Sequence, residues 1–240
     1  MATTTNKQRL LTQFFSALKD GAGDGGAEEG RPVFEQFVYG ICRENATREQ
    51  ADAAFAGLRA RFFDWNEVRV SSPREVEEAL ADLPDAELRA ERIVSFLQEV
   101  FEATYSFDLE GLHKKGVKQA AKALSRYQAA NDYIISWVVQ QSLGGHAVPV
   151  DAPTLRCARR LGLLDTEIED REALRTSLEH LVPKAKGSAF TDLVSVLGTE
   201  YCWEADPNCS ACPLASECPT AQEAGVEVVT AARATRHKPR

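Results

Sequence analysis

Apolar residues recur at helical spacing along most of the chain, and no segment alternates as a strand would. Leu10, Leu11, Phe14 and Leu18, for example, fall on one face of a predicted helix at residues 6–20. Further helices are predicted at 32–41, 48–63, 73–83, 85–101, 117–127, 133–143, 152–163, 170–181 and 187–197. The pattern therefore predicts an all-α fold.

Local signals mark where several of these helices begin and end. Thr47 is a predicted N-cap, and Ser72-Pro73-Arg74-Glu75 has the form of a capping box with proline in the first turn. Asp151 is placed to cap the helix that starts at Ala152. Gly144-Gly145 is a natural stop for the strongly apolar helix before it.

Composition narrows the functional classes. The 240 residues are 44% hydrophobic and 27% charged, which is typical of a globular protein, and no apolar run is long enough to cross a membrane. The N-terminal residues lack an apolar signal core, so we expect a cytoplasmic protein without a membrane partner. The net charge of −8 means that any binding to nucleic acid depends on a local basic surface. Residues 21–31 are predicted to form a flexible linker, and residues 221–240 are predicted to form a mostly disordered tail.

Four of the six cysteines lie close together near the C-terminus. Cys202, Cys209, Cys212 and Cys218 follow the spacing C-x6-C-x2-C-x5-C, in a segment whose prolines favour turns. Four thiolates in one short loop fit a [4Fe–4S] cluster or a structural zinc ion. The spacing favours the cluster because it contains only one short cysteine pair. A disulfide framework is a third reading, which the absence of a secretion signal disfavours.

Taken together, these features resemble the endonuclease III branch of the helix-hairpin-helix DNA glycosylases. The cysteine spacing matches that family's cluster loop, and residues 148–162 are similar to the segment that carries its catalytic aspartate, here Asp151. Residues 41–47 occupy the place of a loop that contacts DNA. The resemblance implies a six-helix domain at 32–145, containing the hairpin, and an iron–sulfur cluster domain formed by 1–20 and 146–220.

The resemblance also implies partners and roles for individual residues. Double-stranded DNA is the expected partner of a monomeric, nucleoid-associated protein, and the target nucleotide is flipped out of the duplex. Asp151 would stabilise the cationic sugar or activate the nucleophile. The four cysteines would hold the cluster. The expected DNA contacts are Asn45, Gln128, Ala130 and Asn131.

The hairpin departs from the family pattern Leu-Pro-Gly-Val-Gly-x-Lys, because this chain has Tyr127-Gln-Ala-Ala-Asn-Asp-Tyr133. Ala129 and Asn131 replace the two glycines, and asparagine can adopt left-handed backbone geometry at some cost. Tyr133 replaces the lysine that forms a Schiff base, so that chemistry is excluded at this position. Glu44 stands where the family tends to have glutamine.

Two functional hypotheses remain. The first is a monofunctional DNA N-glycosylase that uses Asp151, and the second is a catalytically inactive member of the same fold that binds DNA or a protein. Both Asp151 and Tyr133 also have simple structural interpretations. Aspartate is common at helix N-caps, and a tyrosine at the start of an apolar helix is more often a packing residue.

Overall fold

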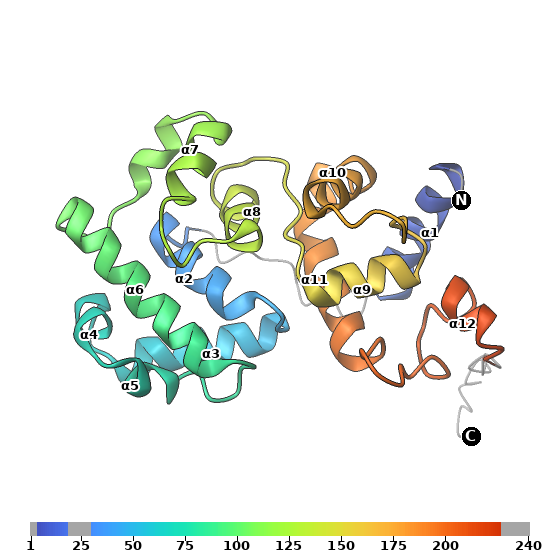
Figure 1. Cartoon of the computed structure of the whole chain (residues 1–240), viewed down its shortest axis with the longest axis horizontal. Helices are drawn as coiled ribbons and strands as arrows, with labels where there is room; N and C mark the ends of the chain where they lie inside the picture. Colours follow the sequence, from blue (N-terminus) through green and yellow to red (C-terminus); the bar gives the residue numbers. More distant parts are fainter. Residues whose placement is uncertain (1–3, 19–29, 227–240) are drawn as a thin grey trace, which may run out of the picture.

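The computed structural model describes residues 4–18 and 30–226, and within these ranges every regular element is a helix (Figure 1). A first lobe is built from α2 (Val33–Arg43), α3 (Arg48–Arg61), α4 (Trp65–Val70), α5 (Pro73–Glu77), α6 (Ala86–Thr104), the 3-10 helix η2 (Glu110–Lys114), α7 (Val117–Leu124) and α8 (Asp132–Gln141). A second lobe is built from α1 (Thr4–Ala17), α9 (Ala152–Arg160), α10 (Arg171–Leu181), η3 (Lys184–Lys186), α11 (Gly187–Glu200) and α12 (Pro219–Glu223). The predicted all-α fold is confirmed.

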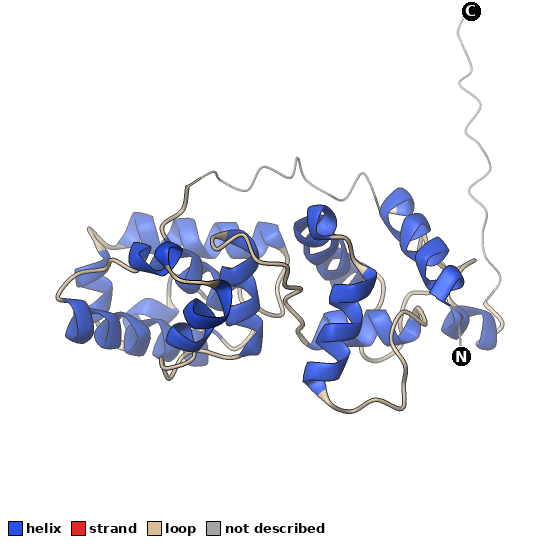
Figure 2. Cartoon of the chain, turned by 90° about the horizontal axis from the view of Figure 1, so that it is seen from above, coloured by secondary structure: helices blue, strands red, loops and turns tan. Residues whose placement is uncertain are grey.

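Each lobe has its own hydrophobic core. In the first lobe, α2 is central because most of its side chains are buried, and Phe37 stacks on Phe96 of α6 with ring centroids 3.8 Å apart. In the second lobe, α1 buries Phe14 against Phe190 of α11, at 5.4 Å between centroids. The N-terminal helix thus packs among C-terminal elements (Figure 2). The domain limits given above stay a prediction.

Most of the predicted helix starts are confirmed. Thr47 and Ser72 both form complete capping boxes, and Asp151 caps α9. The helix predicted to reach Leu83 is wrong in length, since α5 ends at Glu77. Pro84 cannot continue a helix, and turns fill the residues before it. Among the described residues, the short helices α4, η2, η3 and α12 were not predicted.

Other predicted features lie partly or wholly outside the described residues. The linker at 21–31 falls there except for its last two residues, and so does the tail beyond residue 226. Within the part of the chain that the structure describes, no helix combines the length and apolar character needed to cross a bilayer.

A buried arginine joins the two lobes. Arg43, the last residue of α2, is fully buried, and its guanidinium donates to the Asp192 carboxylate at 3.1 Å and to Ser195 Oγ at 2.8 Å, both on α11. It also donates to the backbone carbonyl of Ala46. Burial alone would lower the pKa of Arg43, but Tyr133 and Asp192 outweigh it and raise the pKa, so the guanidinium stays charged.

We expect the variant Asp192→Ala to lower the free energy of unfolding by about 3–5 kcal/mol, because it leaves the Arg43 charge buried without its carboxylate. Urea unfolding followed by tryptophan fluorescence measures this. The control is Glu78→Ala, which removes only an exposed pair with Arg61 and should cost less than about 1 kcal/mol. An equal decrease in the free energy of unfolding in the two variants would contradict the stabilising role of the buried Arg43–Asp192 pair.

Candidate functional site

The loop between α2 and α3, residues 44–47, is held from several sides. Arg89 of α6 is buried and donates to the carbonyls of Ile41 and Glu44, and the Tyr133 hydroxyl donates to the carbonyl of Arg43 at 3.3 Å. Asn45 has a φ of 56°, a left-handed geometry that asparagine tolerates better than most residues. The loop is therefore fixed by side chains from α6 and α8.

Asp151 receives a hydrogen bond on each carboxylate oxygen. Oδ1 accepts from the backbone N–H of Thr154 at 2.9 Å, which caps α9, and Oδ2 accepts from the N–H of Asn45 at 2.9 Å. In return, the N–H of Ala152 donates to Asn45 Oδ1 at 3.3 Å. These two reciprocal hydrogen bonds, between Asn45 and the segment Asp151–Ala152, satisfy an N–H group in the first turn of α9. They also link the two lobes at Asp151. Asp151 is only 6% exposed.

The hairpin between α7 and α8 is braced by a network around Glu44. Glu44 Oε1 accepts a hydrogen bond from Asn131 Nδ2 at 2.8 Å, and Glu44 Oε2 forms an ion pair with Arg92 at 2.9 Å. Arg92 also donates to the carbonyl of Ala129 at 3.0 Å. Because Arg92 compensates its charge, Glu44 is part of the support of the hairpin and not an isolated carboxylate.

Asn131 does not adopt the left-handed backbone geometry that asparagine can reach. Its φ is −142°, and its side chain caps α8 by accepting from the N–H of Ile134 at 2.9 Å. Among the described residues, none in the hairpin turn has a positive φ, so alanine fits at 129 and 130 without strain. Within the same part of the chain, the N–H groups of Ala129 and Asn131 donate no hydrogen bond. Neither donor therefore has an intramolecular acceptor among the described residues.

A cavity of about 270 Å³ brings the predicted residues together. Its lining includes Asn45, Asn131, Tyr133 and Asp151, which come from the α2–α3 loop, the hairpin and the start of α9. Tyr133 is buried, and burial raises the pKa of its phenol well above the usual value. It is a neutral hydrogen-bond donor in this site.

Two other predicted DNA contacts lie in the hairpin turn outside this lining. The N–H of Gln128 donates to both oxygens of Glu99 at 3.2 Å, which leaves its exposed side chain available. The N–H of Ala130 closes the turn onto the carbonyl of Tyr127 at 3.0 Å. Neither observation tests a DNA contact, so both stay predictions.

Sequence reasoning missed two arginines of the cavity. Arg171 and Arg175 line it from the first turns of α10. Arg175 is held in place, since its guanidinium donates to Ser136 Oγ at 3.4 Å and lies 3.9 Å from a carboxylate oxygen of Glu179. Nothing in the local pattern of α10 pointed to the site, because its position follows from lobe packing.

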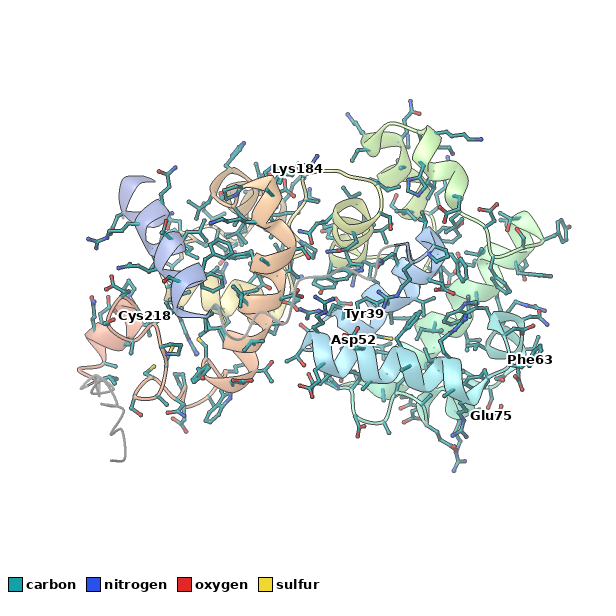
Figure 3. All side chains as sticks on the ribbon, turned by 180° about the vertical axis from the view of Figure 1, so that it is seen from behind. Tyr39, Asp52, Phe63, Glu75, Lys184 and Cys218 are labelled. Atoms are coloured by element: carbon teal, nitrogen blue, oxygen red, sulfur yellow. The ribbon has the colours of Figure 1, made fainter. Side chains whose placement is uncertain are left out.

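A larger cavity of about 750 Å³ lies between α2, α3, α8 and α11. Tyr39 and Asp52 line it, and the Tyr39 hydroxyl donates to the Asp52 carboxylate at 2.6 Å (Figure 3). It contains neither Asp151 nor any hairpin residue. Its polar groups are largely paired with one another, so the smaller cavity is the better candidate site.

The four cysteines of the C-terminal loop line one small cavity of about 20 Å³. Figure 3 places Cys218 at the outer end of the second lobe, far from Phe63 and Glu75 of the first. Arg160 of α9 holds the loop by donating to the carbonyls of Trp203 and Glu204, and it approaches Cys202 Sγ to 3.5 Å. Within the described ranges, no group of three or more histidine, cysteine, aspartate or glutamate side chains has the geometry to hold a metal ion.

The cysteine loop is suited chemically to a thiolate-liganded centre. The four cysteines line a shared space whose other walls are largely apolar, including Leu161, Leu197 and Ala215. Such walls exclude water from a metal centre and its ligands. The donor set therefore fits a group bound through four cysteines.

Comparison with known proteins places these observations in context. No family model matches the chain. The chain is 27% identical over 213 residues to the DNA glycosylase/AP lyase ROS1 of Arabidopsis thaliana, a match that covers 80% of this chain and 15% of that protein. The chain thus spans less than a fifth of the length of this curated relative.

Solved structures match over nearly the whole chain. A complex described as a trapped endonuclease III–DNA covalent intermediate aligns with a TM-score of 0.69 at 17% identity, covering 94% of this chain and 100% of that one. A thermostable thymine-DNA glycosylase aligns with a TM-score of 0.66 at 16% identity, covering 93% and 100%. The chain therefore has the fold of endonuclease III and related DNA glycosylases.

Proposed function

We propose that this protein is a DNA glycosylase of the endonuclease III type, which binds duplex DNA and releases a base from an extruded nucleotide. The observation that carries the proposal is the cavity at the lobe junction. It combines Asp151 with the hairpin and the α2–α3 loop, three parts of the chain that sequence resemblance had linked to this activity one by one. The relative named as a DNA glycosylase and the shared fold support the same proposal.

Asp151 is the proposed catalytic residue. Two backbone N–H groups fix its carboxylate, and each oxygen keeps a lone pair that can accept from a water molecule. When the bond between C1′ and the base nitrogen breaks, the base leaves with the electron pair and the sugar becomes cationic. The carboxylate stabilises that cation and orients the water that adds to C1′. The proton lost by the water balances the one taken up by the departing base.

We further propose that the enzyme is monofunctional. Among the described residues that line the cavity there is no lysine, and the hydroxyl of Tyr133 is committed to the carbonyl of Arg43. A phenol has no amine to condense with the sugar. The relative is named as a glycosylase and AP lyase, so this point separates the chain from it.

DNA would lie across the junction of the lobes. The free N–H groups of Ala129 and Asn131 suit a backbone phosphate, and Asn45 and the side chain of Gln128 border the same region. Ala130 would contribute only backbone contacts. These contacts position the strand so that one nucleotide can leave the stack and enter the cavity.

The cofactor that we propose is a [4Fe–4S] cluster held by Cys202, Cys209, Cys212 and Cys218, with zinc as the alternative. When bound, the cluster would supply a covalent cross-link that fixes the C-terminal loop. Arg160 already ties this loop to α9, the helix that Asp151 caps. The cluster has no part in the bond-breaking step.

The purified protein should release a base from at least one duplex in a panel of damaged and mismatched substrates, without cutting the strand. Borohydride should trap no covalent complex, because the cavity offers no amine. We expect Asp151→Asn to reduce base release by about 10²- to 10⁴-fold while retaining the helix cap, since asparagine caps as well as aspartate.

Circular dichroism of Asp151→Asn is the folding control. Full activity in the folded variant would remove Asp151 from the mechanism. No base release from any duplex, combined with retained DNA affinity, would support the inactive binding protein instead. A borohydride-trapped complex would contradict monofunctional chemistry.

Protein purified without oxygen should be brown, with broad visible absorption and about four iron atoms per chain. We expect this result because the four cysteines line one cavity and could all supply thiolates to a single cluster. Metal analysis and absorption spectroscopy measure this together. A colourless protein with one zinc ion per chain would contradict the cluster.

A further inference from the structure

Arg171 is a charged residue of the candidate site that the mechanism above does not use. It is the first residue of α10, it is exposed, and it lines the same cavity as Asp151. Within the described part of the chain its guanidinium makes no hydrogen bond or ion pair, whereas Arg175, one turn further along, is held by Ser136 and Glu179. Arg171 is therefore the available cation of this cavity.

The position of Arg171 is unfavourable for the stability of its own helix. The first turn of a helix carries partial positive charge, so a cation there is repelled by the helix dipole. Asp170 already caps α10, accepting from the N–H groups of Glu172 and Ala173. Within the described ranges, Arg171 contributes no cap and no ion pair to the fold.

The charges around the cavity indicate what Arg171 could bind. Glu44 is compensated by Arg92, and Asp151 is held by two backbone N–H groups. Asp132, exposed at the start of α8, adds a further negative charge to the lining. A polyanion entering such a site needs a local cation, and the chain as a whole carries a net charge of −8.

We propose that Arg171 binds a phosphate of the DNA strand next to the extruded nucleotide. The guanidinium presents paired donors that match two phosphate oxygens, and its exposure at the cavity leaves it accessible to the backbone of the strand. The contact would hold the strand on the second lobe while the hairpin holds it on the first. This inference rests on the proposed function, since it requires a nucleotide in the cavity.

The test measures binding to a duplex that contains a tetrahydrofuran abasic analogue, by fluorescence anisotropy across a range of KCl concentrations. We expect Arg171→Ala to weaken binding about tenfold and to reduce the slope of log affinity against log salt by about 0.9. Arg171→Lys should retain most of the slope, because it keeps the charge. The matched control is Arg74→Ala, an exposed arginine outside the cavity lining, which should bind as the wild type does.

A second arm locates the phosphate. Neutral methylphosphonate linkages are placed singly on either side of the analogue. One of them should weaken the wild type but leave Arg171→Ala unchanged, as expected for two partners of one contact. The proposal is overturned if the affinity losses caused by Arg171→Ala and by the methylphosphonate are additive at every linkage. It is also overturned if Arg171→Ala binds with the affinity and the salt slope of the wild type.

The outcome is separable from that of the proposed function. Base release by the wild type, together with unchanged binding by Arg171→Ala, would leave the glycosylase standing and overturn the phosphate contact. An Arg171-dependent phosphate effect without any base release would support the contact and count against catalysis.

Discussion

A short loop between α2 and α3 carries the contacts on which the candidate site depends. At its start, the buried Arg43 reaches across to Asp192 of the second lobe. At Asn45, a backbone N–H and a side-chain oxygen form a reciprocal pair with Asp151 and Ala152. The same few residues therefore set the relation of the lobes and the orientation of the proposed catalytic carboxylate. Catalytic geometry and lobe packing cannot vary independently in such an arrangement.

The support of the hairpin shows how this sequence can do without the glycines of the family pattern. The turn avoids left-handed geometry, and Glu44 and Arg92 hold its side chains and carbonyls from outside. In the sequence, Glu44 stands out only because the family tends to have glutamine at its position. In the folded protein it is a structural carboxylate with two partners, Asn131 and Arg92. The N–H groups of Ala129 and Asn131, which we propose for a phosphate contact, donate no hydrogen bond within the described residues.

Sequence reasoning succeeded where the signal was local. The caps at Thr47, Ser72 and Asp151 follow from residue types a few positions apart, and the structure has all three. It failed where the cause was distant or geometric. Arg43 meets Asp192 across 149 positions. No pattern in α10 indicates that Arg171 faces the site. The extended backbone of Asn131, in contrast, has a local cause, because the residue is the N-cap of α8.

The proposed activity requires the junction of the lobes to receive an extruded nucleotide beside Asp151. The most direct measurement is the fluorescence of a duplex with 2-aminopurine in a mismatched pair, because this base brightens when it leaves the stack. Binding of the Asp151→Asn protein should raise the fluorescence, since extrusion precedes chemistry and needs the cavity rather than the charge. Saturated binding with unchanged fluorescence would contradict the account.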